Sequence, residues 1–306
     1  MEQPADEIWP VLASPQGMAG EVSLASRTTP WGDTVGAYVP DISLDPEFLR
    51  TGSSWEHELT ALSLAVRPGD LVVDVGASFG YLTCYLAHLA GPSGSVHAIE
   101  PSTAMFSLLI ENARRNGHRT VRASRVAVGS AAAAAATLWL SSTNLGRHSL
   151  HRDNVPGLAG QELVQQLTMD EYWRTELGGR PVGLLKIDVE GSELAVLRGA
   201  QSMLRSTREV WLEFWPDGIE VTGSDPYKVP GLLRRAGFEI TSWNLLTGER
   251  QQMSDERLLR NMIADARAWV AADGQGYSPI VYLRGRRRPH GRRASWSRLR
   301  IRWGAG

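Results

Sequence analysis

The chain has 306 residues, a hydrophobic content of 42% and a formal net charge of −1, which fits one large α/β domain. No apolar run approaches the roughly 20 residues of a membrane-spanning helix, and the acidic start at Glu2, Asp6 and Glu7 does not resemble a secretory signal. The only cysteine, Cys84, excludes an intramolecular disulfide and a cysteine-rich zinc site, so we expect a cytoplasmic protein.

The predicted elements alternate between helices and strands after an irregular start. Residues 1–50 predict an irregular N-terminal layer that caps the pocket, with a β-like piece at 34–39. Residues 51–283 predict a doubly wound, mostly parallel sheet of the α/β class with helices on both faces. The predicted helices are 55–66, 80–90, 102–116, 170–177, 192–204, 230–236 and 255–271, and the predicted strands are 71–75, 95–100, 121–128, 137–140, 182–188, 209–214, 238–244 and 278–283.

The pattern lapses in two places. Residues 131–136 predict a short helix or a poorly packed turn, and residues 144–150 predict a loop.

The final segment, 284–306, contains nine arginines and no acidic residue, whereas the rest of the chain has 23 basic and 33 acidic residues, a net charge of −10. We expect a disordered basic tail, and its contact with an acidic surface, an anionic lipid or nucleic acid stays open. The acidic body disfavours binding to a long phosphate backbone, so we do not expect a nucleic-acid substrate.

The most informative stretch is the strand 71–75 and the glycine turn after it. The apolar run reaches Asp74 and opens into a turn between Gly76 and Gly80. Such a turn lets a ligand approach free backbone N–H groups. A second strand ends at Glu100, about 20 residues further on, which is the spacing of a carboxylate that accepts a ribose diol. The two strand ends therefore outline a pocket for an adenosine-bearing cofactor.

The charge of this turn favours a particular cofactor. Its G-x-x-x-G spacing lacks the G-x-G-x-x-G of dinucleotide binders, and Asp74 would repel a pyrophosphate. S-adenosylmethionine fits better, because it carries an amino group and a sulfonium beside its ribose and adenine. The segment Asp74–Gly80 resembles the first motif of class I S-adenosylmethionine-dependent methyltransferases, and Ile99-Glu100-Pro101 resembles their second. The alternative is an ordinary strand–turn–helix unit.

A narrower resemblance, to the FkbM family of methyltransferases, covers roughly residues 50–250. The run Lys186-Ile-Asp-Val-Glu-Gly-Ser-Glu193 resembles that family's signature, and Thr168-Met169-Asp170 resembles its Thr-Leu-Asp. The resemblance implies a Rossmann-like fold, S-adenosylmethionine as cofactor, and O-methylation of a hydroxyl on a secondary metabolite or sugar. A small molecule or glycan is then the acceptor. N-methylation, peptide or glycan methylation, a catalytically inactive cofactor-binding scaffold and a homo-oligomer stay open.

The expected cofactor site lies beyond the carboxyl ends of the strands, where open α/β sheets bind ligands. We expect Asp74 to bind the amino end of the cofactor and Glu100 to accept both ribose hydroxyls. The alternatives are a helix cap for Asp74 and a solvated acid for Glu100. Val126 and Ala127, near the end of the third strand, would flank the adenine, as the resemblance implies. The cofactor-binding residues predicted in this way are Asp74, Gly76, Ala77, Gly80, Glu100, Pro101, Val126 and Ala127.

The predicted catalytic residues are mainly acids at later strand ends. We expect Asp188 to be the base that removes the proton of a hydroxyl acceptor, with Glu190 and Glu213 sharing that duty or raising one another's pKa. Lys186 lies on the same strand face as Asp188 and predicts an ion pair. The alternatives are a structural network of lysine and acids, or a divalent metal on the acids; we predict no metal. His148 is a further candidate base, and an ordinary surface histidine is the alternative.

Overall fold

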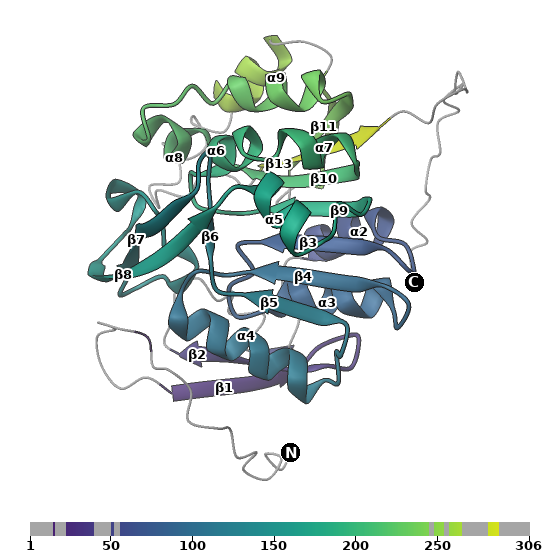
Figure 1. Ribbon diagram of the computed structural model, residues 1–306, viewed down its shortest axis with the longest axis vertical. Helices are drawn as coiled ribbons and strands as arrows, with labels where there is room; N and C mark the ends of the chain where they lie inside the picture. Colours follow the sequence, from purple (N-terminus) through teal and green to yellow (C-terminus); the bar gives the residue numbers. More distant parts are fainter. Residues whose placement is uncertain are drawn as a thin grey trace.

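The central sheet is built from segments spread over most of the chain. The computed structural model describes residues 15, 23–39, 50–51, 56–244, 248–253, 257–264 and 281–287. Its main strands are β3 (Leu71–Val75), β4 (Ser95–Ile99), β5 (Val121–Ser124), β9 (Val182–Ile187), β10 (Thr207–Phe214), β11 (Phe238–Asn244), β12 (Arg250–Gln252) and β13 (Val281–Arg287). Within the described residues they form one eight-stranded sheet in the order β12-β11-β13-β10-β9-β3-β4-β5 (Figure 1).

The middle of this sheet is parallel. β5, β4, β3, β9 and β10 pair side by side in the same direction, while β13 runs antiparallel between β10 and β11. β3, β4, β9 and β10 are mostly buried on both faces, as parallel strands covered by helices require, whereas the edge strand β5 is partly exposed. The prediction of a doubly wound, mostly parallel α/β sheet is confirmed.

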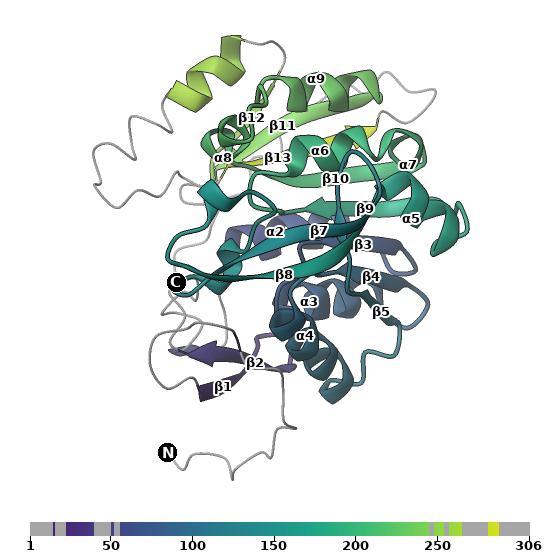
Figure 2. The ribbon, with the colours of Figure 1, turned by 60° about the vertical axis from the view of Figure 1, so that its left-hand side comes forward.

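Helices cover both faces of the sheet (Figures 1 and 2). The helices form two groups, one on each face. Val72 and Leu184 pack with Leu62 and Leu86 of the first group. Val73 and the strand residues whose side chains point in the same direction as that of Val73 pack with the second group. Of the helices in the described segments, none is long and apolar enough to cross a bilayer. The first group is α2 (Glu56–Ala65), α3 (Tyr81–Ala90) and α4 (Thr103–Arg115), and the second is α5 (Met169–Thr175), α6 (Glu193–Arg198), α7 (Gln201–Arg205), α8 (Pro216–Val221) and α9 (Lys228–Arg235).

An N-terminal hairpin packs against the end of α4. Its antiparallel strands are β1 (Ser23–Thr28) and β2 (Thr34–Val39), so the predicted β-like piece at 34–39 is a strand. Asn112 donates to the carbonyl of Gly36 and accepts from its N–H at 3.0 and 2.8 Å, and Asn116 makes the same pair of bonds with Thr34 at 2.9 and 2.7 Å. Two α4 side chains therefore align the hairpin on the domain. Most of the predicted layer 1–50 lies outside the described residues.

A second small sheet stands beside the main one. β6 (Ala127–Val128), β8 (Leu158–Leu167) and β7 (Ala133–Ser141) form it in that order. The predicted single strand 121–128 is wrong, because the chain leaves the main sheet after Ser124 and residues 127–128 pair with β8. The predicted helix or turn at 131–136 is also wrong: β7 pairs with β8, and this pairing overrides the helix propensity of alanine. Short 3₁₀ turns, η1 (Leu145–Arg147) and η2 (Arg152–Asn154), follow β7.

The C-terminal half corrects two further boundaries. The predicted helix 192–204 is two helices, and between them a Cβ at Gly199 would lie 2.2 Å from the Gly129 carbonyl oxygen. The expected tail does not start at 284, because β13 continues to Arg287 and Arg284 pairs with Glu209 at 2.7 Å. Residues 288–306 lie outside the described residues. Of the predicted helix 255–271, residues 257–264 are helical and the rest lies outside the described part of the chain.

Candidate functional site

The glycine turn after β3 lies between the ends of two neighbouring strands. The N–H groups of Gly76 and Ala77 both donate to the Ile99 carbonyl of β4, at 3.0 and 3.1 Å. Gly76 has φ +78°, and a Cβ there would lie 1.7 Å from the Asp188 carbonyl oxygen. Gly80 also has a positive φ, +88°, directly before α3. The need for glycine at position 76 therefore comes from the close approach of the β9 loop, a contact that the sequence pattern did not reveal.

Asp74 is held inside this turn by a buried lysine. Its side chain is fully buried, with Lys186 Nζ 3.2 Å from Oδ1 and Thr83 Oγ1 donating to Oδ2 at 2.7 Å. Lys186 is 2% exposed and also donates to the Gly76 carbonyl at 3.2 Å. Its Nζ lies 3.4 Å from Asp188 Oδ2, so the predicted Lys186–Asp188 ion pair is confirmed. A contact between Asp74 and the cofactor stays a prediction.

Glu100 combines burial with free acceptor capacity. Its two oxygens accept the N–H groups of Ser78 and Ser102 at 2.9 and 2.8 Å, and the residue is 6% exposed. Burial raises the pKa of Glu100 to about 7, against the lowering effect of these two hydrogen bonds. Because a carboxylate has about four acceptor positions, two remain for the hydroxyls of a ribose. These two acceptor positions fit the ribose of the predicted cofactor.

The remaining predicted cofactor residues occupy different environments. Ala77 is 5% exposed and packs with Ala98 below the turn. Pro101 follows Glu100 and is half-buried, and Val126 is half-buried against the main core. Ala127 is 3% exposed and packs inside the small β6–β8 sheet, so its side chain contributes to that sheet's core. The adenine contact predicted for Val126 and Ala127 stays a prediction.

Three predicted catalytic acids come together at the ends of β9 and β10. One oxygen from each of Asp188, Glu190 and Glu213 lies within 4.8 Å of the others, and all three residues are half-buried. Burial and the neighbouring negative charge of Asp188 raise the pKa of Glu190 and of Glu213 well above the usual carboxyl range. Glu213 also shares a hydrogen bond with Asp188. This arrangement can accept and hold a proton at the rim of the sheet.

Glu190 is fixed by the segment that follows β7. It has φ +51°, an uncommon conformation for a residue other than glycine. Its carbonyl accepts Ser149 Oγ at 2.8 Å and Asn154 Nδ2 at 3.1 Å, and its carboxylate lies 3.0 Å from Arg147 Nε. The Arg147 guanidinium stacks 4.1 Å above the Trp215 ring. The sequence placed a loop at 144–150 but did not reveal these partners of Glu190.

His148 lies in the same segment with a different role from the one predicted. Its Nδ1 accepts the backbone N–H of Ser141 at 3.1 Å, and burial lowers its pKa to about 4. The neutral ring then carries its hydrogen on Nε2. The ring therefore offers a donor, and its basic nitrogen is already used by the backbone. This geometry does not support a general-base role for His148.

The site does not coincide with a hollow at the β4–β5 edge of the sheet. A cavity of about 590 Å³ lies along β4 and β5 and is lined by Gly94, Ser95, His97, Arg119, Thr120, Arg122, Ala123, Ser124, Tyr172, Glu176 and Arg180. None of the predicted site residues lines it. The strand-end acids, rather than this cavity, define the candidate site.

Comparisons with known proteins agree with the resemblance. The family model "Methyltransferase FkbM domain" matches residues 74–240. The 31-O-demethyl-FK506 methyltransferase FkbM of Streptomyces tacrolimicus is 34% identical over 162 residues, 44% of this chain and 61% of the relative. The hexuronic acid methyltransferase AglP of Haloferax volcanii is 28% identical over 188 residues, 60% of this chain and 71% of the relative. The chain thus spans about three fifths of the length of the first of these relatives.

Solved structures align with the chain at low sequence identity. Aeropyrum pernix fibrillarin with bound S-adenosyl-L-methionine aligns with a TM-score of 0.41 and 15% identity, covering 76% of each chain. The family match is the firmer result, because residues 74–240 are more than half of the chain and include both predicted motifs. The chain belongs to the FkbM methyltransferase domain family, and S-adenosylmethionine is its cofactor.

Proposed function

We propose that this chain transfers the methyl group of S-adenosylmethionine to a hydroxyl oxygen of a secondary metabolite or sugar. The observation that carries the proposal is the position of Asp188. Its N–H donates to the Val75 carbonyl at 3.0 Å, directly before the glycine turn, while its side chain is 25% exposed. An accessible carboxylate therefore stands beside the loop that we assign to the cofactor.

The cofactor supplies a methyl group on a sulfonium, and the chain orients it. Glu100 has two free acceptor positions for the ribose hydroxyls. Lys186 connects Asp74, the Gly76 carbonyl and Asp188 within 3.4 Å of its Nζ, so it fixes the turn relative to the carboxylate. Holding reacting groups in line contributes much of the acceleration of such a transfer.

The acids at the rim receive the proton that the acceptor loses. As the hydroxyl oxygen bonds to the methyl carbon, the carbon–sulfur bond breaks and the hydroxyl proton passes to Asp188. Lys186 Nζ, 3.4 Å from Asp188 Oδ2, holds this carboxylate in place. Glu213 shares a hydrogen bond with Asp188, so the proton that Asp188 takes up lies within a hydrogen-bonded pair of carboxyl groups.

The acceptor class is supported by the named relatives. One acts, by its name, on 31-O-demethyl-FK506 and the other on a hexuronic acid. Both substrates carry hydroxyl groups, which need a base when they are methylated. The half-buried carboxylates at the end of β9 supply such a base.

The test is a metabolite comparison between a strain with the gene and a deletion strain. We expect the deletion strain to accumulate a hydroxyl compound that is lighter by one methylene unit. Purified protein with S-adenosylmethionine should then convert that compound to its methyl ether and release S-adenosylhomocysteine. Methylation at nitrogen, or binding of the compound without conversion, would contradict the proposal.

A further inference from the structure

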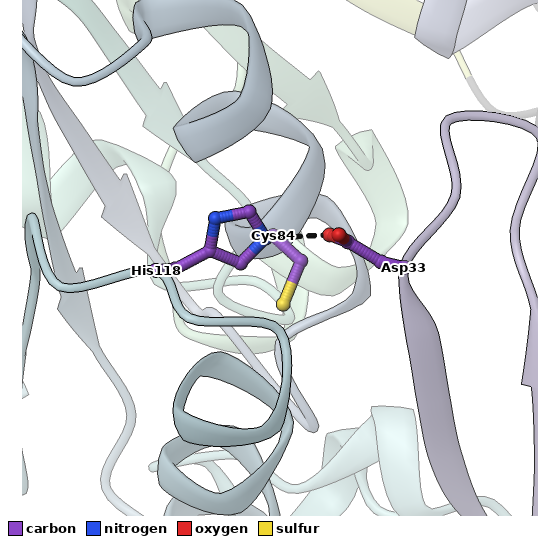
Figure 3. Close-up of side chains that lie close together, drawn as sticks. All are labelled: Asp33, Cys84 and His118. Carbon is purple, nitrogen blue, oxygen red and sulfur yellow. Dashed lines mark hydrogen bonds and ion pairs between the residues drawn. The ribbon is translucent and has the colours of Figure 1, made fainter.

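A cluster of three ligand-type side chains lies outside the proposed active site. Asp33 stands at the turn between β1 and β2, Cys84 on α3, and His118 between α4 and β5. One potential ligand atom from each lies within 4.8 Å of the other two. Figure 3 shows Asp33 and His118 facing each other, with the Cys84 side chain next to their contact. Three separate segments thus bring oxygen, sulfur and nitrogen to one point.

The cluster is buried and its carboxylate is oriented. Asp33 is 8% exposed and Cys84 is fully buried. His118 Nε2 lies 2.5 Å from Asp33 Oδ2, and the same oxygen accepts Trp31 Nε1 at 2.8 Å. A hydrogen bond that orients a ligand from outside the coordination sphere is typical of metal sites in proteins. Here the Trp31 indole N–H makes this orienting hydrogen bond to Asp33.

The cluster is not needed to align the hairpin. Asn112 and Asn116 already make four hydrogen bonds to the backbone of Gly36 and Thr34. Nor does Cys84 suit a role as a free nucleophile, because burial, with Asp33 and Asp74 nearby, raises the pKa of its thiol. The gathering of these three side chains therefore has another explanation.

Their chemistry matches that of a zinc site. Zn²⁺ binds thiolate sulfur at about 2.3 Å and imidazole nitrogen or carboxylate oxygen at about 2.0–2.2 Å. Ligand atoms on one such ion lie about 3–4 Å apart, so atoms within 4.8 Å can reach it by small side-chain rotations. The mixture of sulfur, nitrogen and oxygen favours Zn²⁺ over Mg²⁺ or Ca²⁺, which take oxygen ligands.

We propose that Asp33, Cys84 and His118 bind one Zn²⁺ that fastens the N-terminal hairpin to the methyltransferase domain. The metal takes no part in methyl transfer, and with three protein ligands its fourth position is left for a water. It joins β1–β2, α3 and the α4–β5 turn at a point beyond the asparagine contacts. The ion would replace the direct Asp33–His118 contact with bonds from each residue to the metal.

The first experiment measures metal in the full-length chain without an affinity tag. The protein is stripped with a chelator, reloaded with Zn²⁺ and desalted, and bound metal is determined by mass spectrometry. We expect one zinc per chain and a higher melting temperature than that of the stripped protein. Loading with Co²⁺ should give a near-ultraviolet thiolate-to-metal band, which reports on Cys84 because it is the only cysteine.

Variants separate the proposed site from adventitious binding. Cys84→Ala and His118→Gln should each lose the retained zinc, and Trp31→Phe should weaken zinc binding by about 10–100-fold through the lost indole hydrogen bond. His88→Gln is the control, since His88 is exposed one turn after Cys84 on α3. Failure of the unsubstituted chain to retain zinc, or equal retention in both ligand variants, would overturn the proposal. Should the variants not fold, the Co²⁺ band of the unsubstituted chain decides: its absence rejects the site.

Discussion

The acids on the two sides of the rim formed by the strand ends have different bonding partners. On the β3–β4 side, Glu100 accepts two backbone N–H groups, and Asp74 is paired with Lys186 and Thr83. On the β9–β10 side, Glu190 and Glu213 face each other and Asp188, and the pKa of each glutamate is raised. The first side holds fixed polar contacts, and we propose that it binds the cofactor. The second can exchange protons, and we propose that it is the catalytic side.

The largest expected effect is on turnover. In Asp188→Asn the side chain keeps its size but cannot accept the hydroxyl proton, so turnover should fall by about 10²–10⁴-fold. Calorimetry should show cofactor binding retained, since the groups on the β3–β4 side are unchanged. The matched control is Asp153→Asn, an exposed acid in the segment after β7. Loss of cofactor binding in the Asp188 variant would show that Asp188 binds the cofactor and would contradict the proposed role as a base.

The next effect is on stability. Lys186→Met leaves Asp74 buried and unpaired, and removal of one partner from a buried ion pair costs about 3–5 kcal/mol. Denaturant unfolding should measure this loss. The control is Lys228→Met, because Lys228 is exposed and is the only other lysine in the chain. Equal free energies of unfolding of the two variants would show that the pairing of Lys186 with the acids on both sides of the rim does not stabilise the fold.

A smaller effect is expected on cofactor affinity. Glu100→Gln removes the charge that accepts the ribose hydroxyls and should weaken S-adenosylhomocysteine binding by about 1.5–3 kcal/mol. Asp170→Asn is a matched control, since Asp170 also accepts two backbone N–H groups, those of Ser202 and Met203, but lies outside the rim. Titration calorimetry distinguishes the two. An unchanged affinity in Glu100→Gln would place the ribose elsewhere.

The same comparison shows which features a sequence can reveal. The strand ends at Asp74 and Glu100 follow from local patterns, namely an apolar run, a glycine turn and a spacing of about 20 residues. The contact of Lys186 with Asp74 depends on β3 and β9 being neighbours, which is a property of the sheet order. The predicted strand 137–140 lies within β7, but the first part of β7 and its pairing with β8 were missed, because the alanine run has no clear period and the pairing is non-local. Contacts such as Arg147 with Glu190 join segments that no local pattern connects.

The smallest effect is expected on the pH dependence of stability, for a change that leaves no new polar group unpaired. Glu58, on α2, accepts Trp211 Nε1 at 3.2 Å, and burial raises its pKa from 4.5 to about 7. Between these values the unfolded chain loses a proton that the folded chain keeps. The free energy of unfolding therefore falls as the pH rises through this window and shows no further loss from this group above it.

Glu58→Gln should reduce that pH dependence, because the amide does not titrate and its oxygen can still accept the indole N–H. The measurement is the free energy of unfolding at several pH values across the window, compared with Glu56→Gln, an exposed change on the same helix. An unaltered slope in Glu58→Gln would mean that burial near Lys186 does not keep this acid protonated.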